Sequence, residues 1–124
     1  MDPAGVVASS IRIEGLRNCI EIDESCIKHL STCEKEVKIG RWRADLKCGD
    51  VYVEVEPLER LACGLGQVLL WGSLGVETVL LVFGRGDARE LELAARYVPV
   101  VYIDAELKYI CRYMEGASTC VSFG

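Results

Sequence analysis

The 124-residue sequence has little of what marks a membrane, secreted or zinc-binding protein. Its longest apolar run, around 79–83, is far shorter than the roughly 20 residues that a membrane helix needs. The amino terminus, Met-Asp-Pro-Ala-Gly, has an acid where a signal peptide has positive charge. None of the seven cysteines forms a Cys-x-x-Cys pair, the usual local signature of zinc and iron–sulfur sites. These features predict a cytoplasmic protein that binds no membrane.

Side-chain amides are also scarce, with one Asn and one Gln, and the net charge is −5. An acidic chain is a poor candidate for a protein that coats DNA or builds chromatin, because such proteins bind nucleic acid by neutralising its phosphates. Acidity is compatible with an enzyme that collects metal ions in an acidic pocket. Few thermolabile amides together with many cysteines are typical of intracellular hyperthermophile proteins, archaeal ones included, that carry disulfides. Alternatively, the cysteines are ordinary buried thiols. Their odd number leaves at least one thiol unpaired or paired between chains.

The hydrophobic pattern predicts a mobile leader over 1–10 and one α/β domain over 11–124, with a mixed sheet flanked by helices. Short strands are expected within 11–22. The rest predicts the order helix, hairpin, helix, strand, helix, strand, helix. The ranges are a helix over 23–36, strands over 37–47 and 51–56, a helix over 57–74, a strand over 77–83, a helix from 87, a strand over 99–103 and a last helix from 104.

The hairpin brings acidic side chains together. Val51, Val53 and Val55 alternate with polar residues, which is the clearest strand signal in the chain. With a turn at Gly49-Asp50, residues whose numbers sum to 99 face each other, so Asp45 lies opposite Glu54. Two carboxylates on one sheet face form an oxygen site suited to Mg²⁺ or Mn²⁺. A solvated polar face of the hairpin is the simpler alternative.

Asp45 lies on one strand, Glu54 lies on the next strand, and the following helix contains Gln67-Val-Leu-Leu-Trp71. These three features resemble the PD-(D/E)xK nuclease superfamily, and Glu54 stands where the family has the acid of its acid-x-Lys pattern. The likeness is to its RecB/Cas4-like exonucleases and archaeal Holliday-junction resolvases. The resemblance implies a restriction-endonuclease-like fold and a metal-dependent DNA nuclease that hydrolyses phosphodiester bonds. It implies Asp45 and Glu54 as metal ligands, Gln67 as an orienting residue, Trp71 as a stacking or packing residue, and Glu24 as a further acid.

The sequence departs from the family where the motif has lysine, because Glu56 stands there. Glutamate cannot activate the attacking water or offset transition-state charge as lysine does. Three interpretations stay open. Lys47, on the same strand face as Asp45, takes over the role; Glu56 is a third metal ligand; or the site is inactive and Glu56 pairs with Arg43 across the hairpin.

Two other functions compete with a nuclease. Gly84-Arg85-Gly86, between a strand and a helix, resembles a nucleotide-binding βαβ turn, but its third glycine is missing. A catalytically inactive subunit for nucleic-acid binding or assembly is the other alternative, with Trp42 and Arg43 in a basic stretch that could contact DNA. By analogy with small nuclease cores, a homodimer or larger complex is expected.

Overall fold

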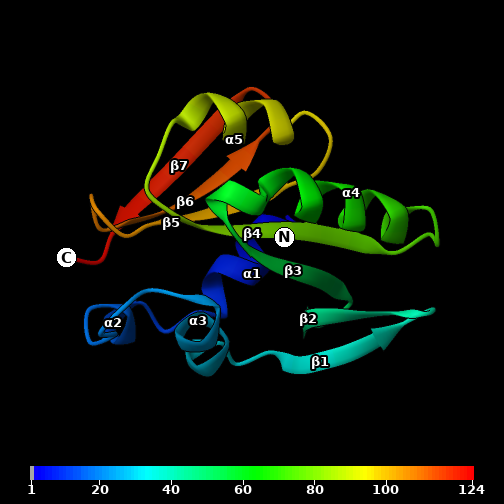
Figure 1. Cartoon of the computed structure of the whole chain (residues 1–124), viewed down its shortest axis with the longest axis horizontal. Helices are drawn as coiled ribbons and strands as arrows, with labels where there is room; N and C mark the ends of the chain where they lie inside the picture. Colours follow the sequence, from blue (N-terminus) through cyan, green and yellow to red (C-terminus); the bar gives the residue numbers. More distant parts are fainter. Residues whose placement is uncertain (1) are drawn as a thin grey trace.

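A seven-stranded mixed sheet organises residues 2–124, the part of the chain that the computed structural model describes (Figure 1). The strands lie side by side in chain order from β1 to β7. β3, β4 and β5 are parallel, and every other neighbouring pair is antiparallel. The bounds are β1 Glu34–Ile39, β2 Trp42–Cys48, β3 Val51–Pro57, β4 Glu77–Gly84, β5 Val100–Asp104, β6 Tyr109–Met114 and β7 Ala117–Ser122. The prediction of an α/β chain with a mixed sheet and an antiparallel hairpin is confirmed.

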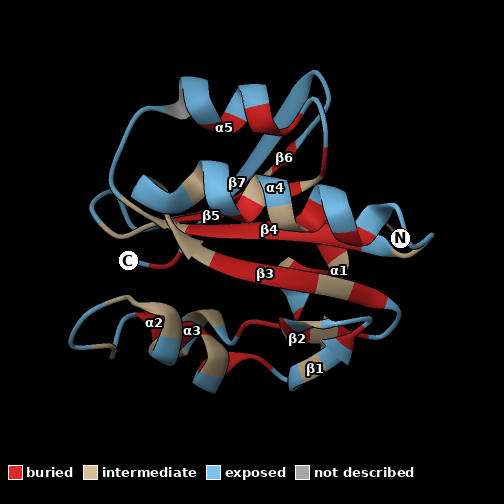
Figure 2. Ribbon diagram, turned by 45° about the vertical axis from the view of Figure 1, so that its right-hand side comes forward, coloured by how far each residue is buried: buried red, intermediate tan, exposed pale blue. Residues whose placement is uncertain are grey.

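Helices cover both faces of the sheet, and each face has its own apolar cluster. Three short helices, α1 (Pro3–Ser9), α2 (Ile13–Leu16) and α3 (Glu24–Leu30), pack on one face. The other face carries α4 (Leu61–Gly72), which follows the 3-10 turn Leu58–Arg60, and α5 (Ala88–Ala94). β3 and β4 are buried along most of their length between these layers (Figure 2), as expected for parallel strands covered on both sides. No helix of residues 2–124 is long and apolar enough to span a membrane.

Most of the leader predicted over 1–10 is instead the packed helix α1, while residue 1 lies outside the described residues. Asp2 caps α1 by accepting a hydrogen bond from the Gly5 amide at 2.7 Å. Ala4 and Val7 are fully buried in the first cluster. Residues 3–9 show no hydrophobic periodicity because so short a helix buries only a few side chains, and most of these are small. The strands predicted within 11–22 are also wrong: Ile11 makes one isolated bridge, and α2 follows.

The run over 37–47, predicted as one strand, is two. A turn at Gly40 and Arg41 separates β1 from β2, and Gly40 has the positive φ of 58° that glycine tolerates best. The preceding helix, predicted to reach residue 36, ends at Leu30 because β1 takes the residues from Glu34 onward.

The last predicted helix is a β-hairpin instead. Asp104 does act as a cap, but it serves only a turn, accepting hydrogen bonds from the amides of Glu106 and Leu107. β6 and β7 then pair across the two-residue turn at 115–116, where Gly116 has a φ of 77°. Tyr109, Ile110 and Tyr113 of β6 have the aromatic and β-branched side chains that favour strands, a signal that the helical spacing of its apolar residues hid.

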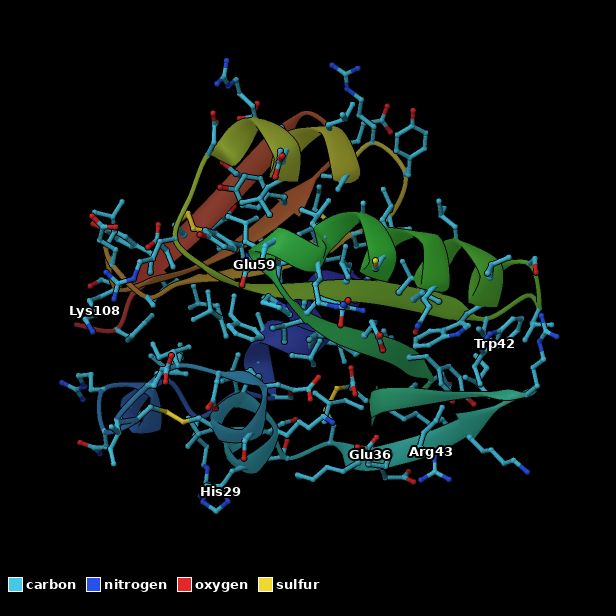
Figure 3. All side chains as sticks on the ribbon, viewed as in Figure 1. His29, Glu36, Trp42, Arg43, Glu59 and Lys108 are labelled. Atoms are coloured by element: carbon cyan, nitrogen blue, oxygen red, sulfur yellow. A yellow bond between two sulfur atoms is a disulfide. The ribbon has the colours of Figure 1, made fainter. Side chains whose placement is uncertain are left out.

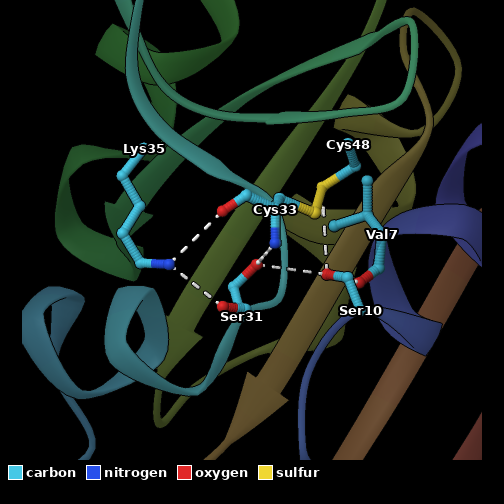
Figure 4. Close-up of a disulfide and its surroundings, with 6 residues drawn as sticks. All are labelled: Val7, Ser10, Ser31, Cys33, Lys35 and Cys48. Carbon is cyan, nitrogen blue, oxygen red and sulfur yellow. Dashed lines mark hydrogen bonds between the residues drawn. A yellow bond between two sulfur atoms is a disulfide. The ribbon is translucent and has the colours of Figure 1, made fainter.

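Three disulfides tie the chain together, which confirms the disulfide expectation. They join Cys19 to Cys26, Cys33 to Cys48 and Cys111 to Cys120, while the exposed Cys63 is free. The bridge between Cys33 and Cys48 fixes the start of β1 to the end of β2 (Figure 4). Around it, buried Ser10 and Ser31 lie with their hydroxyl oxygens 3.4 Å apart. Disulfides are typical of oxidising compartments and of some intracellular hyperthermophile proteins, so a cytoplasmic location stays a prediction.

Candidate functional site

Asp45 occupies a break in the sheet. The β2–β3 ladder has the predicted register, with Leu46 opposite Val53 and Lys47 opposite Tyr52, but these pairs stop short of Asp45. The Asp45 carboxylate instead accepts a hydrogen bond from the Val55 amide at 2.7 Å, an amide that would otherwise need a backbone carbonyl. This hydrogen bond fixes the Asp45 side chain against β3.

The other neighbour of β2 is irregular at the same level. The β1–β2 ladder pairs Lys35 with Leu46 and Val37 with Ala44, and omits the intervening Glu36 and Asp45. Glu36 has a φ of 54°, a left-handed conformation that is uncommon for a residue other than glycine. Strained backbone of this kind often accompanies functional sites. The distortion turns Glu36 and Asp45 towards a common cation.

That cation is Lys28 of α3. Its Nζ lies 2.9 Å from Asp45 Oδ1, 2.9 Å from Glu36 Oε1 and 3.7 Å from Glu24 Oε2. The Lys28 side chain is only 15% exposed, and these carboxylates raise its pKa although burial opposes the charge. A charged lysine therefore sits at the centre of three acids, held by α3, β1 and β2.

Glu54, on β3, is the most deeply buried acid of the site, with 7% of its surface exposed. Burial is the largest cause that raises its pKa to about 9, followed by a hydrogen bond to Asp45 and the charge of Asp45. The charges of Glu56 and Glu24 add to the rise. The raised pKa favours the protonated, neutral form of Glu54 at neutral pH. The prediction that Asp45 and Glu54 meet agrees with this proximity.

Glu56 lies two residues further along the same strand face and does not pair with Arg43. Glu56 instead forms an ion pair with Arg60, which ends the 3-10 turn before α4. Oε2 of Glu56 lies 3.4 Å from Nε of Arg60. Arg43 is exposed and lies opposite Lys38 of β1 (Figure 3). Burial, the largest cause, raises the pKa of Glu56 even though Arg60 opposes the rise. The predicted pairing of Glu56 with Arg43 is therefore wrong.

Helix α4 approaches this face closely through Gly64. A Cβ at this position would lie 2.7 Å from Cγ of Glu56 and 2.7 Å from Cδ1 of Leu80, so only glycine lets the helix pack this near. Gln67, half-buried, lies three residues further on the same side of the helix. Trp71, one more turn along, is fully buried in the second cluster. Of the roles that the resemblance implied for Trp71, packing is observed, and its ring is inaccessible to a substrate.

Two other predicted residues lie away from the acids. Lys47 places its Nζ over the ring of Tyr52, 5.4 Å from the centroid, and has no ion pair with Asp45. Trp42, at the start of β2, lies under the guanidinium of Arg41 at 4.9 Å (Figure 3). It is near the turn that joins β1 to β2. Both contacts are local to the hairpin, and the lysine that contacts Asp45 is Lys28.

The donor set suits a hard cation but is small. Within residues 2–124, no group of three or more His, Cys, Asp or Glu side chains is arranged to hold a metal ion. Asp45 and Glu54 do provide two adjacent oxygen donors in a partly dehydrated place, and Mg²⁺ commonly binds through one or two carboxylates plus water and substrate phosphate. The pair therefore fits Mg²⁺ or Mn²⁺ in donor type.

The alternative nucleotide site is explained by packing. A Cβ at Gly86 would lie 2.2 Å from Cδ2 of Leu58, and one at Gly84 would lie 3.2 Å from Cβ of the same residue. Asp87 caps α5 and holds the Arg89 side chain, which puts a carboxylate where a phosphate would bind. These contacts account for both glycines without a nucleotide.

Lys28 is the residue that sequence reasoning missed. It belongs to a predicted helix, and its spacing of four from Glu24 indicates only an ordinary surface ion pair. Its contacts with β1 and β2 depend on how α3 packs, which no local pattern reveals.

Comparison with protein-family models, curated proteins and solved structures finds no match to this chain.

Proposed function

We propose that this chain is a restriction-endonuclease-like domain that hydrolyses phosphodiester bonds in DNA, with Mg²⁺ or Mn²⁺ at Asp45 and Glu54. The observation that carries the proposal is the buried Glu54, whose pKa is raised, beside Asp45 and together with the Lys28 ammonium. Strongly perturbed acids that share one place with a lysine are more frequent at catalytic sites than elsewhere.

The order of elements supports the proposal. Helix α3 precedes the antiparallel strands β1, β2 and β3, and α4 then leads to the parallel strand β4. The resemblance implies this succession, with the acids on β2 and β3 and the glutamine on the following helix. α3 also brings Glu24 close enough to raise the pKa of Glu54, in agreement with the further acid that the resemblance implies.

Each residue of the site has a separate task in the proposed reaction. Asp45 and Glu54 hold the cation, which when bound polarises the phosphate and lowers the pKa of water. Lys28 keeps the Asp45 carboxylate fixed and adds positive charge near the phosphate, as lysine at the motif position would. Glu56, with its raised pKa, accepts the proton of the attacking water. Gln67 orients the water or the phosphate from α4.

The test is cleavage of end-labelled single-stranded, duplex and branched DNA with Mn²⁺ at elevated temperature. Asp45→Asn keeps an oxygen for the Val55 amide but loses the charge, so we expect the wild type to cut and this variant to lose at least a hundredfold in rate. Glu59→Gln is the matched control, because Glu59 is an exposed acid just after β3. No cleavage of any substrate by folded wild type would overturn the proposal, as would equal rates in the Asp45 variant.

A second candidate is an inactive nuclease-fold subunit for nucleic-acid binding or assembly. Lys28 favours it, because its ammonium already neutralises Asp45 Oδ1 and can replace a metal ion rather than assist one. This candidate predicts DNA binding that is the same in EDTA and in Mn²⁺, with no cleavage. Fluorescence anisotropy with the same labelled DNA separates the two.

A further inference from the structure

The two edges of the sheet differ in charge. β1, at one edge, alternates Glu34, Lys35, Glu36 and Lys38, and the left-handed Glu36 breaks its regular backbone. Charges and bulges of this kind prevent an edge strand from pairing with another chain. β7, at the other edge, reads Ala-Ser-Thr-Cys-Val-Ser, with no charge and no proline, and all six residues are exposed.

β7 is nevertheless held in register with β6. The disulfide between Cys111 and Cys120 fixes it to β6, with the two Cα atoms 4.0 Å apart. The helices leave it open, since α5 packs on β5 and β6 while α1 packs on β3 to β6. In Figure 1 β7 is the strand furthest from β1. It is an uncharged edge, linked covalently to β6 and with free backbone groups.

The turn determines which backbone groups of β7 are free. In a hairpin with a two-residue turn, the closing pair, here Met114 and Ala117, exchanges both hydrogen bonds, and the pattern alternates from there. Ser118, Cys120 and Ser122 therefore direct their N–H and C=O groups away from β6. The short Cα distance between Cys111 and Cys120 agrees, because the closer pairs are those without hydrogen bonds.

We propose that β7 pairs antiparallel with β7 of a second copy of this chain, so that the two sheets become one. The free groups are self-complementary about Cys120: Ser118 faces Ser122 of the second copy, and the two Cys120 residues face each other. This register forms about six hydrogen bonds between chains and leaves no outward group of these residues unpaired. Two-fold symmetry then follows from the pairing itself.

Side chains support the same register. Thr119 and Val121 lie on the α1 face of β7, beside a hollow of about 240 Å³ that Ile110 and Arg112 also line. In the proposed pairing Thr119 lies opposite Val121 of the second copy, a contact between β-branched residues that stabilises sheets. Val121 is 52% exposed in the single chain. Because β7 has no charge, self-pairing brings no like charges together, whereas β1 would.

The test is the mass in solution, measured by light scattering after size exclusion between 1 and 500 µM, without DNA or metal. We expect the wild type to approach twice the 13.7 kDa chain mass as concentration rises. Ser118→Pro removes an outward N–H and no bond to β6, so it should shift dimerisation to at least tenfold higher concentration. Ser118→Ala keeps the N–H and should dimerise as the wild type does.

A second variant keeps the test independent of backbone strain from proline. Val121→Lys places a charge in the proposed contact from an already exposed side chain, so the chain should fold normally and stay monomeric. A wild type that is monomeric throughout the range would overturn the proposal. So would a dimer of unchanged affinity in both Ser118→Pro and Val121→Lys. Either result leaves the proposed cleavage activity untouched, because the acids lie on β2 and β3.

Discussion

Replacing Glu54 with glutamine should stabilise the protein, and the gain should depend on pH. The pKa of Glu54 rises from 4.5 to about 9 on folding, mainly through burial. Between these values the unfolded chain has lost a proton that the folded chain keeps, so stability falls as pH rises, by up to about 1.4 kcal/mol per pH unit. Over the interval from 4.5 to 7 this amounts to about 3 kcal/mol. Glutamine has nearly the same shape and does not ionise.

We therefore expect Glu54→Gln to match the wild type near pH 4 and to exceed its free energy of unfolding by about 1–3 kcal/mol at pH 7, since relaxation of the site reduces the full value. The gain should grow further at pH 8.5. Urea unfolding in EDTA at these pH values measures it, and the exposed Glu59→Gln is the matched control. A variant that is equal to or less stable than the wild type at pH 8.5 would refute the assignment of a buried, protonated Glu54.

Three further perturbations test the packing around the site. Lys28→Met leaves three acids without their shared ammonium and should cost about 1–3 kcal/mol at pH 7, a cost that shrinks near pH 4; the exposed Lys38→Met should change little. Equal losses in the two variants, by urea unfolding, would contradict the network. Gly64→Ala should cost about 1–3 kcal/mol of unfolding free energy, because the new Cβ would meet Glu56 and Leu80. Gly66→Ala has open space and should stabilise α4 by up to about 1 kcal/mol. A melting temperature that is higher for Gly64→Ala than for Gly66→Ala would refute the close approach. Reduction of the disulfides should lower the free energy of unfolding by about 2–3 kcal/mol for each loop that a disulfide closes. Cys63→Ser should not alter that difference, because Cys63 is free. Unfolding curves that coincide with and without a phosphine reductant would show that the bridges do not form.

The central part of the fold was predictable because its signals are local. Alternating valines identified β3, and the turn at Gly49 set a register that the observed pairs of β2 and β3 confirm. The apolar runs over 77–83 and 99–103 correctly indicated strands, and these are β4 and β5, which pair in parallel. Proximity of Asp45 to Glu54 followed from that register alone, although the ladder itself ends one pair earlier.

The parts that were missed depend on contacts between distant segments. α1 is short, and it is a stable element because Ala4 and Val7 are buried against the sheet. In β6, the spacing of Ile110, Cys111 and Met114 fits a helix as well as a strand, and the pairing with β5 decides between them. Lys28 becomes part of the site only once α3 packs beside β1 and β2.

The proposed activity depends on uptake of a divalent cation by Asp45 and Glu54, and calorimetric titration of the metal-free protein with Mn²⁺ at pH 7.5 tests that uptake most directly. Because Glu54 is protonated before binding, repeating the titration in buffers of different ionisation enthalpy should reveal about one proton released per Mn²⁺ bound. Asp45→Asn should bind at least tenfold more weakly, and Glu59→Gln should bind as the wild type does. Binding with this proton release would support the cation site; no binding by the wild type at millimolar Mn²⁺, or equal binding by Asp45→Asn, would contradict it.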